Sequence, residues 1–523
     1  MGGDGNRSLI FRVGVTALFL LYVAAAGTFA YGGRINQDEG WYLYAAGLVY
    51  DGWLPYRDFA FFQAPLLPFV YGLPQKLLGA GLPLGRITSL LFGAAAIALG
   101  ARLSFVRGGR FGALVFLALA PLTPLLLWTY TTTRTEPLSA FLLTLSALLL
   151  FRRDAGPASA SAAALAAMLA AATRISSLPL AGLVVAWVAH RHRRSPRALG
   201  LAVGPALLVA GLLAALVAAA GAESTWFHLV TSQTERHVQL QDLEPWTLWR
   251  QLSQRAIDVA ALRSFFGGVP LVSFACAAGA LAAWVARRDR NSVAARASAL
   301  ALFAFVAYLP NLAPRVVYPV YFAAVLPLFL ALASWCIGHV HARASREGRR
   351  AIAAGVGVVL AFQLGTLLSQ SRNHLPAGTP DLAALRQGAE HLSEVVPPGA
   401  LLGTLDTYLA VASERRVPRS WEMGLFSYFP KRSPEDGERL HLLTRERLAA
   451  SLADPLLGAV VLSDRSLGLL SEHGVFGYRP MERLTEEQIH EAVPGLTRFR
   501  LDHVFEDFGQ FHDRVYVLLP RVE

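Results

Sequence analysis

The sequence predicts a polytopic α-helical membrane protein with about eleven transmembrane helices, followed by a small α/β domain outside the membrane. The first observation is composition: of 523 residues, 54% are hydrophobic and 16% are charged, with a mean hydropathy of +0.43. Soluble proteins of this length are less apolar. The second observation is that long apolar runs alternate with arginine-rich loops through residues 1–371, and the third is that this alternation ends in residues 372–523. These two ranges are the predicted domains.

The distribution of charge excludes nucleic acid as the reason for the formal net charge of +11. Residues 1–371 hold 30 Lys and Arg against 14 Asp and Glu, giving +16, whereas residues 372–523 hold 17 against 22, giving −5. The positive charge belongs to the apolar part, where it reports membrane topology. Cys276 and Cys336 both lie in apolar runs, so they predict no disulfide framework.

Eleven apolar segments approach the roughly 20 residues that a transmembrane helix needs. They are 9–31, 84–106, 110–127, 136–151, 158–173, 175–190, 197–221, 267–287, 294–309, 315–338 and 350–369. The first could instead be a signal peptide, since Arg7 and Arg12 precede it. Its apolar run is longer than a usual signal-peptide core and further spans follow, so we predict an uncleaved helix.

Arginine placement predicts the topology. With a cytoplasmic N-terminus, the inner loops carry 19 basic residues against 4 acidic ones. The basic residues are Arg7, Arg12, Arg102, Arg107, Arg110, Arg152, Arg153, Arg191, Arg193, Arg194, Arg197, Arg287, Arg288, Arg290, Arg296, Arg343, Arg346, Arg349 and Arg350. Every inner loop satisfies the positive-inside rule, and eleven spans place the C-terminal domain outside. A bacterial inner membrane is the expected location.

Two outer loops are long, 32–83 and 222–266, and both are rich in Trp and Tyr, as is typical of residues at headgroup depth. The apolar stretch 59–78 in the first loop is nearly long enough to span the membrane. It contains three prolines, which break helices, and counting it as a span would put the arginines outside. We therefore predict an interfacial helix there.

The C-terminal part has the patterns of a soluble α/β domain. Residues 381–396 (DLAALRQGAEHLSEVV) have helical spacing, and residues 396–405 (VPPGALLGTL) predict a turn into a strand. GAVVLSD at 458–464 and DRVYVLLP at 513–520 are typical of further strands.

The unusual charges in the apolar part all fall at the predicted outer ends of spans, and none falls at mid-bilayer. They are Asp38, Glu39, Arg134, Glu136, Arg174 and Arg315. A transporter or lipid flippase, the main alternative, places polar groups near the midplane. Guanidinium groups at an interface suit a phosphate, and a nearby carboxylate can accept a proton from an attacking hydroxyl. The pattern favours transfer from a lipid-phosphate donor.

Each of these residues also has a structural interpretation. The two acids after the first span could be a solvated loop pair, and Arg134 with Glu136 could cap a helix. Arg174 and Arg315 could extend to the lipid headgroups from apolar surroundings. His228 and His237 favour surface or packing roles over ligation. A membrane scaffold or sensor without catalysis is a further alternative. The shared outer face is what favours a functional site.

The layout resembles the membrane glycosyltransferases of the GT-C superfamily, and is similar to the relatives of protein O-mannosyltransferases and of the lipid A aminoarabinose transferase. The residues that carry the resemblance are DEGWYLYAAGLVYDGWLPYRDF at 38–59, RTEPL at 134–138, TRIS at 173–176 and PRVVYP at 314–319. The stretch FFQAP at 61–65 departs from the pattern, since many relatives have a lysine before the proline.

The resemblance implies inverting transfer of a sugar from a polyprenyl-phosphate-linked donor to a glycan, lipid or protein acceptor. It implies catalytic acids at Asp38, Glu39 and Glu136, with Asp38 as general base. It implies donor-phosphate contacts at Arg134, Arg174, Arg315 and Tyr318. Residues expected to wall the cavity or contact the acceptor are Tyr56, Asp58, Gln63, His228 and His237. The acids could also hold a divalent cation, Mg or Mn.

Overall fold

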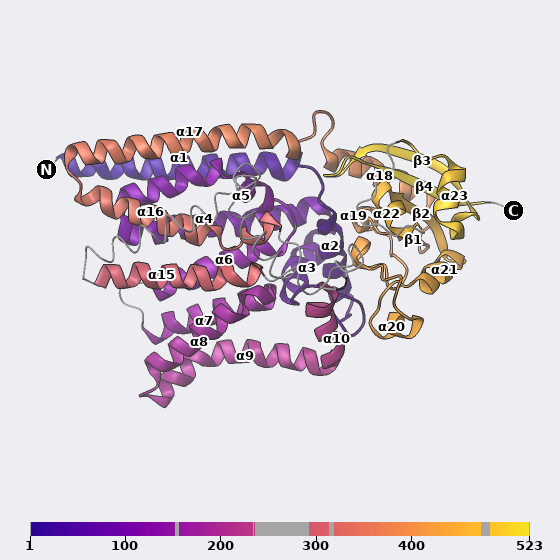
Figure 1. The fold of residues 1–523 in the computed structure, drawn as a ribbon, viewed down its shortest axis with the longest axis horizontal. Helices are drawn as coiled ribbons and strands as arrows, with labels where there is room; N and C mark the ends of the chain where they lie inside the picture. Colours follow the sequence, from indigo (N-terminus) through magenta and orange to yellow (C-terminus); the bar gives the residue numbers. More distant parts are fainter. Residues whose placement is uncertain are drawn as a thin grey trace, which may run out of the picture. The chain divides into compact units, whose positions relative to one another are not determined.

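The computed structural model describes residues 2–151, 156–233, 235, 292–312, 318–471 and 482–521 (Figure 1). The chain divides into two compact units. The first contains Met1–Ala30, Ser89–Leu213 and Pro245–Arg372, and the second contains Tyr31–Thr88, Ala214–Glu244 and Asn373–Glu523. The predicted span 267–287 and most of the predicted loop 222–266 lie outside the described residues.

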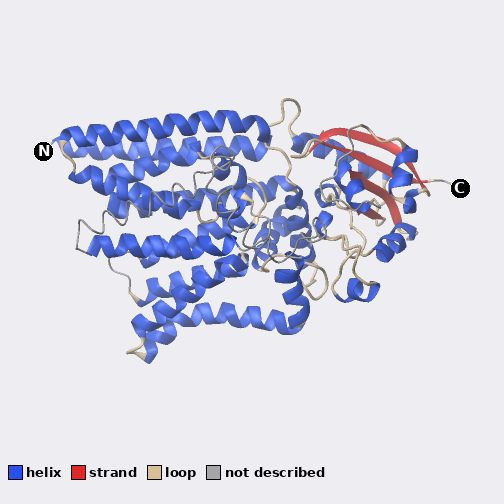
Figure 2. Cartoon of the chain, viewed as in Figure 1, coloured by secondary structure: helices blue, strands red, loops and turns tan. Residues whose placement is uncertain are grey.

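The first unit is built of apolar helices (Figure 2). Among the described residues, six lie wholly in it: α5 (Pro124–Thr129), α6 (Thr135–Leu150), α7 (Pro157–Thr173), α8 (Leu178–His192), α15 (Ser292–Tyr308) and α16 (Leu326–Arg343). Three more of the described helices begin in it and end in the second unit, α1 (Gly2–Gly32), α9 (Pro196–Ala220) and α17 (Arg346–His374), whereas α4 (Leu82–Leu119) begins in the second unit and continues into the first. Within the described residues, four stretches are long and apolar enough to cross a membrane: Ser8–Gly32, Leu82–Val106, Pro196–Ala220 and Arg346–His374. Shorter apolar helices lie between them. The chain is therefore a multi-pass membrane protein, and the count of eleven spans stays a prediction.

One predicted boundary between spans is confirmed and one predicted span start is wrong. The predicted boundary between the segments 84–106 and 110–127 is confirmed, because two apolar helical stretches, Leu82–Val106 and Gly108–Leu122, are separated by a break at Gly109, whose φ of 64° favours glycine. The tenth span was expected to start at residue 315, but α16 begins at Leu326. A short 3₁₀ turn, η5 (Pro319–Phe322), precedes it.

The second unit contains a four-stranded mixed sheet. Its strands are β1 (Leu401–Thr404), β2 (Leu457–Ser463), β3 (Phe499–Phe508) and β4 (Asp513–Pro520), in the order β1-β2-β4-β3. Strands β1 and β2 are parallel, whereas β4 pairs antiparallel with both β2 and β3 (Figure 2). The predicted strands at β1, β2 and β4 and the predicted helix α18 (Asp381–Val395) are present. Strand β3 is not among the predicted strands.

Short helices follow the strands in this unit. They are α19 (Thr407–Ala412), α20 (Pro434–Arg439), α21 (Arg445–Ala453), α22 (Asp464–Leu470) and α23 (Glu486–Ala492). The first outer loop supplies α2 (Gln37–Tyr50) and α3 (Leu66–Leu78), and α10 (Ala222–Trp226) continues into a π-helical turn, Phe227–Thr231.

Helix α2 shares a hydrophobic core with the sheet. Ile35 and Leu43 belong to the same buried cluster as residues of β2 and β4. At Gly40 the helix meets α19 so closely that an added Cβ would lie 2.2 Å from the Tyr408 backbone nitrogen. Only glycine fits this approach, so the start of α2 is held at a fixed position on the second unit.

Glu422 is a buried acid in this unit. It is 5% exposed, and its Oε2 has no hydrogen-bond partner within the described part of the chain. Burial raises the pKa of this carboxyl to about 7, from an ordinary value of 4.5. Since the folded pKa is the higher one, the folded state binds the extra proton, and the contribution to stability is lost as pH rises between about 4.5 and 7.

We expect Glu422→Gln to raise the unfolding temperature at pH 8 but to change it little at pH 5. The shift in pKa corresponds to about 3 kcal/mol of unfolding free energy across that pH range. Thermal unfolding of both proteins in detergent at the two pH values measures this. Glu438→Gln, at an exposed position on α20, is the matched control. An equal shift at both pH values would contradict the prediction.

Candidate active site

Glu39 is held inside the second unit by two kinds of contact. It completes a capping box at the start of α2, accepting from the Asn36 backbone N–H at 3.0 Å. Its two carboxylate oxygens also accept from Arg86, at 2.8 Å from Nε and 2.7 Å from Nη2. Arg86 donates further to the backbone carbonyls of Gly33 and Arg34. Glu39 and Arg86 are 0% and 1% exposed, so they form a buried, bidentate pair.

Asp38, next in sequence, points to a different environment. Its side chain is half-buried, and the Trp41 indole Nε1 donates to its Oδ1 at 3.3 Å. Phe61 and Phe426 pack edge-on against the Trp41 ring, with centroids 5.8 and 6.1 Å away, and hold the indole in place. Asp38 also lies in the first turn of α2, where the helix dipole favours an ionised carboxylate. Of the two acids, Asp38 is therefore the more exposed.

Three predicted residues come together in the first unit. Arg174 pairs with Glu136 through Nη1 and donates to the Thr135 hydroxyl at 3.1 Å. Arg134 Nε lies 3.6 Å from the second oxygen of Glu136. Arg134, Glu136 and Arg174 are 8%, 2% and 8% exposed. Two guanidinium groups and one carboxylate sum to a charge of +1, and positive charge at a buried site favours the binding of an anion.

Helix packing explains how these three residues meet. Arg134 is the extended residue before α6, Glu136 lies in the first turn of that helix, and Arg174 ends α7. The two helices are neighbours along the chain, and the Ser146 hydroxyl donates to the Ala163 carbonyl at 2.9 Å. The inward face of α7 is almost all alanine, which allows α6 to pack closely. The start of α6 and the end of α7 then lie at the same end of the pair.

Aromatic rings flank the two arginines. The Arg134 guanidinium lies 5.8 Å from the Trp128 ring centroid, and that of Arg174 lies 5.7 Å from the Tyr321 ring. Tyr318, predicted to contact the donor phosphate, packs edge-on against Tyr321 at 5.6 Å and is 46% exposed. Tyr318 is thus linked to the arginine cluster through Tyr321. Arg315 and His237 lie outside the described residues.

The residues predicted to wall the cavity are in the second unit, and most are held by contacts with one another. His228 is fully buried, with Nδ1 2.7 Å from the Ser224 carbonyl and Nε2 3.0 Å from the Leu440 carbonyl. The Tyr56 hydroxyl donates to the Gln63 carbonyl, and burial raises the pKa of Tyr56 well above its usual value. Through these contacts, Tyr56 and His228 stabilise the packing of the second unit.

Asp58 stabilises a tight turn. Its carboxylate accepts from the Leu54 backbone N–H at 2.7 Å and from the Arg57 side chain. The hydrogen bond from Arg57 holds the pKa of Asp58 below its usual range. Asp58 therefore stays ionised and fixes the turn.

Sequence reasoning missed Arg86 and Tyr321. Arg86 opens α4 within an apolar segment, and a charge at the edge of a span was a signal that could have found it. Tyr321 follows Tyr318 by three residues, a spacing that brings rings together in a 3₁₀ turn. Across the residues that the structure describes, no three His, Cys, Asp or Glu side chains gather as a metal site, and the divalent cation stays a prediction.

Comparison with known proteins gives a match only in structure. No protein-family model matches the chain, and no curated protein matches it. ArnT from Cupriavidus metallidurans bound to undecaprenyl phosphate matches at 14% identity with a TM-score of 0.55, over 98% of each chain. Its apo state matches at 15% identity with a TM-score of 0.59, over 99% of this chain and 98% of that one. An Archaeoglobus fulgidus oligosaccharyltransferase, in complex with Zn and sulfate, matches at 12% identity and a TM-score of 0.48, over 94% of this chain and 79% of that one.

The chain therefore has the fold of a membrane glycosyltransferase of the GT-C type. The resemblance predicted from the four sequence motifs is confirmed at the level of fold, along nearly the whole length of ArnT.

Proposed function

We propose that this protein is a membrane glycosyltransferase that moves a sugar from a polyprenyl-phosphate-linked donor to an acceptor hydroxyl at the outer face of the membrane. The observation that carries the proposal is the buried cluster of Arg134, Glu136 and Arg174, which holds an excess positive charge at the end of two apolar helices. The fold shared with ArnT, whose structure holds undecaprenyl phosphate, supports the choice of ligand.

In this mechanism the donor phosphate binds to the arginine cluster. Guanidinium groups match two phosphate oxygens at once, and Glu136 keeps both arginines in place between turnovers. When the bond between the sugar and phosphate breaks, the phosphate oxygen takes the electron pair. The arginines stabilise the polyprenyl phosphate that leaves, because they are already positioned for the added negative charge. Tyr318, and Arg315 outside the described residues, remain further candidates for donor contact.

Asp38 is the proposed general base. It accepts the proton of the acceptor hydroxyl as the oxygen attacks the anomeric carbon, and this single displacement inverts the configuration. Glu39 cannot serve as readily, because Arg86 occupies both of its oxygens. We assign Glu39 and Arg86 a positioning role: they hold the first turn of α2, and hence Asp38, in place. Glu136 is assigned the same kind of role toward the arginines.

The proposed topology has a cytoplasmic N-terminus and an extracytoplasmic C-terminal domain. The arginine-rich inner loops support it. Helix α3 supports an interfacial first outer loop, because Phe69, Leu73 and Leu77 are exposed on one face at intervals of four residues. Such a stripe is typical of a helix that lies in the membrane interface.

Removing one guanidinium tests the donor site. We expect Arg174→Met to weaken binding of polyprenyl phosphate by about 10–100-fold, because charge-assisted hydrogen bonds contribute about 1.5–3 kcal/mol. Arg174→Lys should lose less, since it keeps the charge but not the paired geometry. Binding of radiolabelled polyprenyl phosphate to the purified protein in nanodiscs measures the effect.

Arg197→Met, at an exposed position on α9, is the matched control. It should bind as the parent protein does. If Arg174→Met folds normally and binds polyprenyl phosphate as tightly as the parent, then Arg174 does not contact the donor and the proposed site is wrong.

A further inference from the structure

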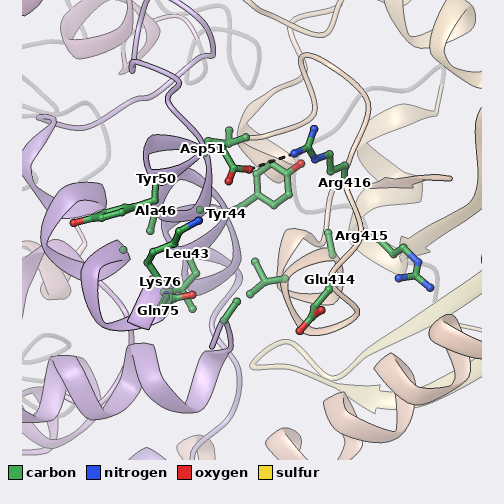
Figure 3. Close-up of a pocket in the computed structure, with 16 residues that line it drawn as sticks. Leu43, Tyr44, Ala46, Tyr50, Asp51, Gln75, Lys76, Glu414, Arg415 and Arg416 are labelled. Atoms are coloured by element: carbon green, nitrogen blue, oxygen red, sulfur yellow. Dashed lines mark hydrogen bonds and ion pairs between the residues drawn. The ribbon is translucent and has the colours of Figure 1, made fainter. Parts of the chain in front are cut away.

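A pocket of about 270 Å³ opens within the second unit (Figure 3). It is lined by α2 from Leu43 to Asp51, by the end of α3, and by the turn Glu414–Arg416 that follows α19. Asp38 lies in the first turn of α2 and does not line the pocket: the lining begins at Leu43, five residues and about 7.5 Å further along the helix, and ends at Asp51, about 20 Å along. The volume is just below the range of about 300–1,000 Å³ that suits drug-sized ligands, and fits a small ligand of one or two rings.

The charged groups of the pocket favour an anion. Lys76, Arg415 and Arg416 line it together with Asp51 and Glu414, but the Arg415 guanidinium points away and donates to the Ser413 and Val396 carbonyls, so Lys76 and Arg416 are the cations that a ligand could contact (Figure 3). Asp51 pairs with Arg416 at 3.4 Å, and both side chains are exposed. Lys76 is exposed and makes no hydrogen bond or ion pair within the part of the chain that is described. An exposed ammonium group at the mouth of a pocket is available to an anionic ligand.

The remaining polar and aromatic groups favour a saccharide. The Tyr44 hydroxyl accepts from the Val417 N–H at 2.9 Å, and the Tyr50 hydroxyl donates to the Phe69 carbonyl at 2.9 Å. These bonds fix both rings at the pocket wall, where their faces can cover the apolar C–H surface of a sugar. Gln75 in the wall is 7% exposed, and its Nε2 has no hydrogen-bond partner within the described residues.

The position of Lys76 indicates where such a ligand would come from. Lys76 immediately precedes Leu77, which belongs to the exposed apolar stripe of α3 and is 71% exposed. If that stripe lies in the membrane interface, Lys76 lies at the depth of lipid headgroups. A sugar with a phosphate or carboxylate could reach the pocket either on a lipid or free in solution.

We propose that this pocket binds an anionic saccharide, with Lys76 and Arg416 contacting its phosphate or carboxylate and with Tyr44 and Tyr50 covering its ring. That the saccharide is part of the acceptor rests on the proposed function, whereas the binding itself does not. The carboxylate of Asp51 orients Arg416 and can accept from sugar hydroxyls.

Lysine chemistry gives a direct test, because Lys76 and Lys431 are the only two lysines in the sequence. The full-length protein in nanodiscs is acetylated with and without glucose 6-phosphate, glucose or inorganic phosphate, and mass spectrometry follows each lysine. A second arm uses nanodiscs that contain a glycolipid with a phosphorylated glucosamine headgroup. We expect glucose 6-phosphate or the glycolipid to slow acetylation of Lys76 at least fivefold. Lys431, also exposed, should be unaffected.

Two variants test the contacts proposed for Arg416 and Tyr50. Arg416→Gln and Tyr50→Leu should each weaken ligand binding, so that about tenfold more ligand is needed to protect Lys76. The unfolding temperature of each variant should be unchanged. Protection only by the glycolipid would assign the ligand to the membrane, and protection by glucose 6-phosphate would assign it to solution. The proposal would be overturned if inorganic phosphate protected Lys76 as well as glucose 6-phosphate does, or if Lys431 were protected to the same extent as Lys76. It would also be overturned if no probe protected Lys76. Asp38→Asn should keep the protection, so failure of the pocket and failure of the proposed activity are distinguishable.

Discussion

Replacing Asp38 with Asn is expected to lower the rate of sugar transfer by about 10²–10⁴-fold, the usual contribution of a general base. The amide keeps the shape of the side chain and can still accept from the Trp41 indole, but it cannot take a proton. Donor binding should be unchanged, because the proposed phosphate contacts come from the first unit. Transfer from radiolabelled polyprenyl-phosphate sugars, at matched protein levels, measures the effect.

Asp454→Asn is the matched control, since Asp454 is also half-buried and also accepts a local hydrogen bond, in its case from the Leu456 backbone N–H at 2.8 Å. It should retain parental activity. Asp38→Glu should recover part of the lost rate. Full transfer by a folded Asp38→Asn protein would show that another acid acts as the base, and Glu136 would then be tested next.

Breaking the Glu39–Arg86 pair should have the largest effect on stability. Arg86→Met leaves the Glu39 carboxylate buried without its partner, and loss of one member of a buried ion pair costs about 3–5 kcal/mol. For a unit of this size we expect an unfolding temperature lower by about 5–10 °C. Thermal unfolding in detergent at one fixed scan rate checks this.

The double variant Glu39→Gln with Arg86→Met removes both charges and should recover much of the lost unfolding temperature. Both variants should lose activity, because the first turn of α2 is no longer held. An Arg86→Met protein with parental stability and activity would show that the pair has no positioning role.

Local sequence patterns predicted much of the fold. Helices α6 and α7 correspond to predicted apolar segments, α18 has helical spacing, and β2 and β4 are short apolar runs, so each is specified by nearby residues. The missed strand β3 alternates only loosely, and its two register shifts against β4 weaken the pattern further. The break at Gly109 falls in the predicted arginine-rich connection between the segments 84–106 and 110–127, but its positive φ could not be predicted, because glycine permits a positive φ without requiring one.

The candidate site shows a similar division. The charges of Arg134, Glu136 and Arg174 were recognisable from their position at span ends, and short connections bring α6 and α7 together. By contrast, Glu39 and Asp38 are indistinguishable as neighbouring acids in the sequence. What distinguishes Glu39 is its bidentate pair with Arg86, which lies 47 residues away in the sequence. Contacts of that separation are set by tertiary packing and leave no local pattern.

The most direct test of the central claim is to incubate the purified protein in nanodiscs with a panel of radiolabelled polyprenyl-phosphate sugars and an extract of envelope acceptors. We predict that at least one donor is consumed, that polyprenyl phosphate is released in equal amount, and that the sugar appears on an acceptor with inverted anomeric configuration. Asp38→Asn should slow this release about 10²–10⁴-fold, and Arg174→Met should reduce it at donor concentrations that saturate only the parent. Contradiction would come from a folded parent protein that leaves every donor intact, and above all from one that moves an intact donor across the bilayer, as a flippase would.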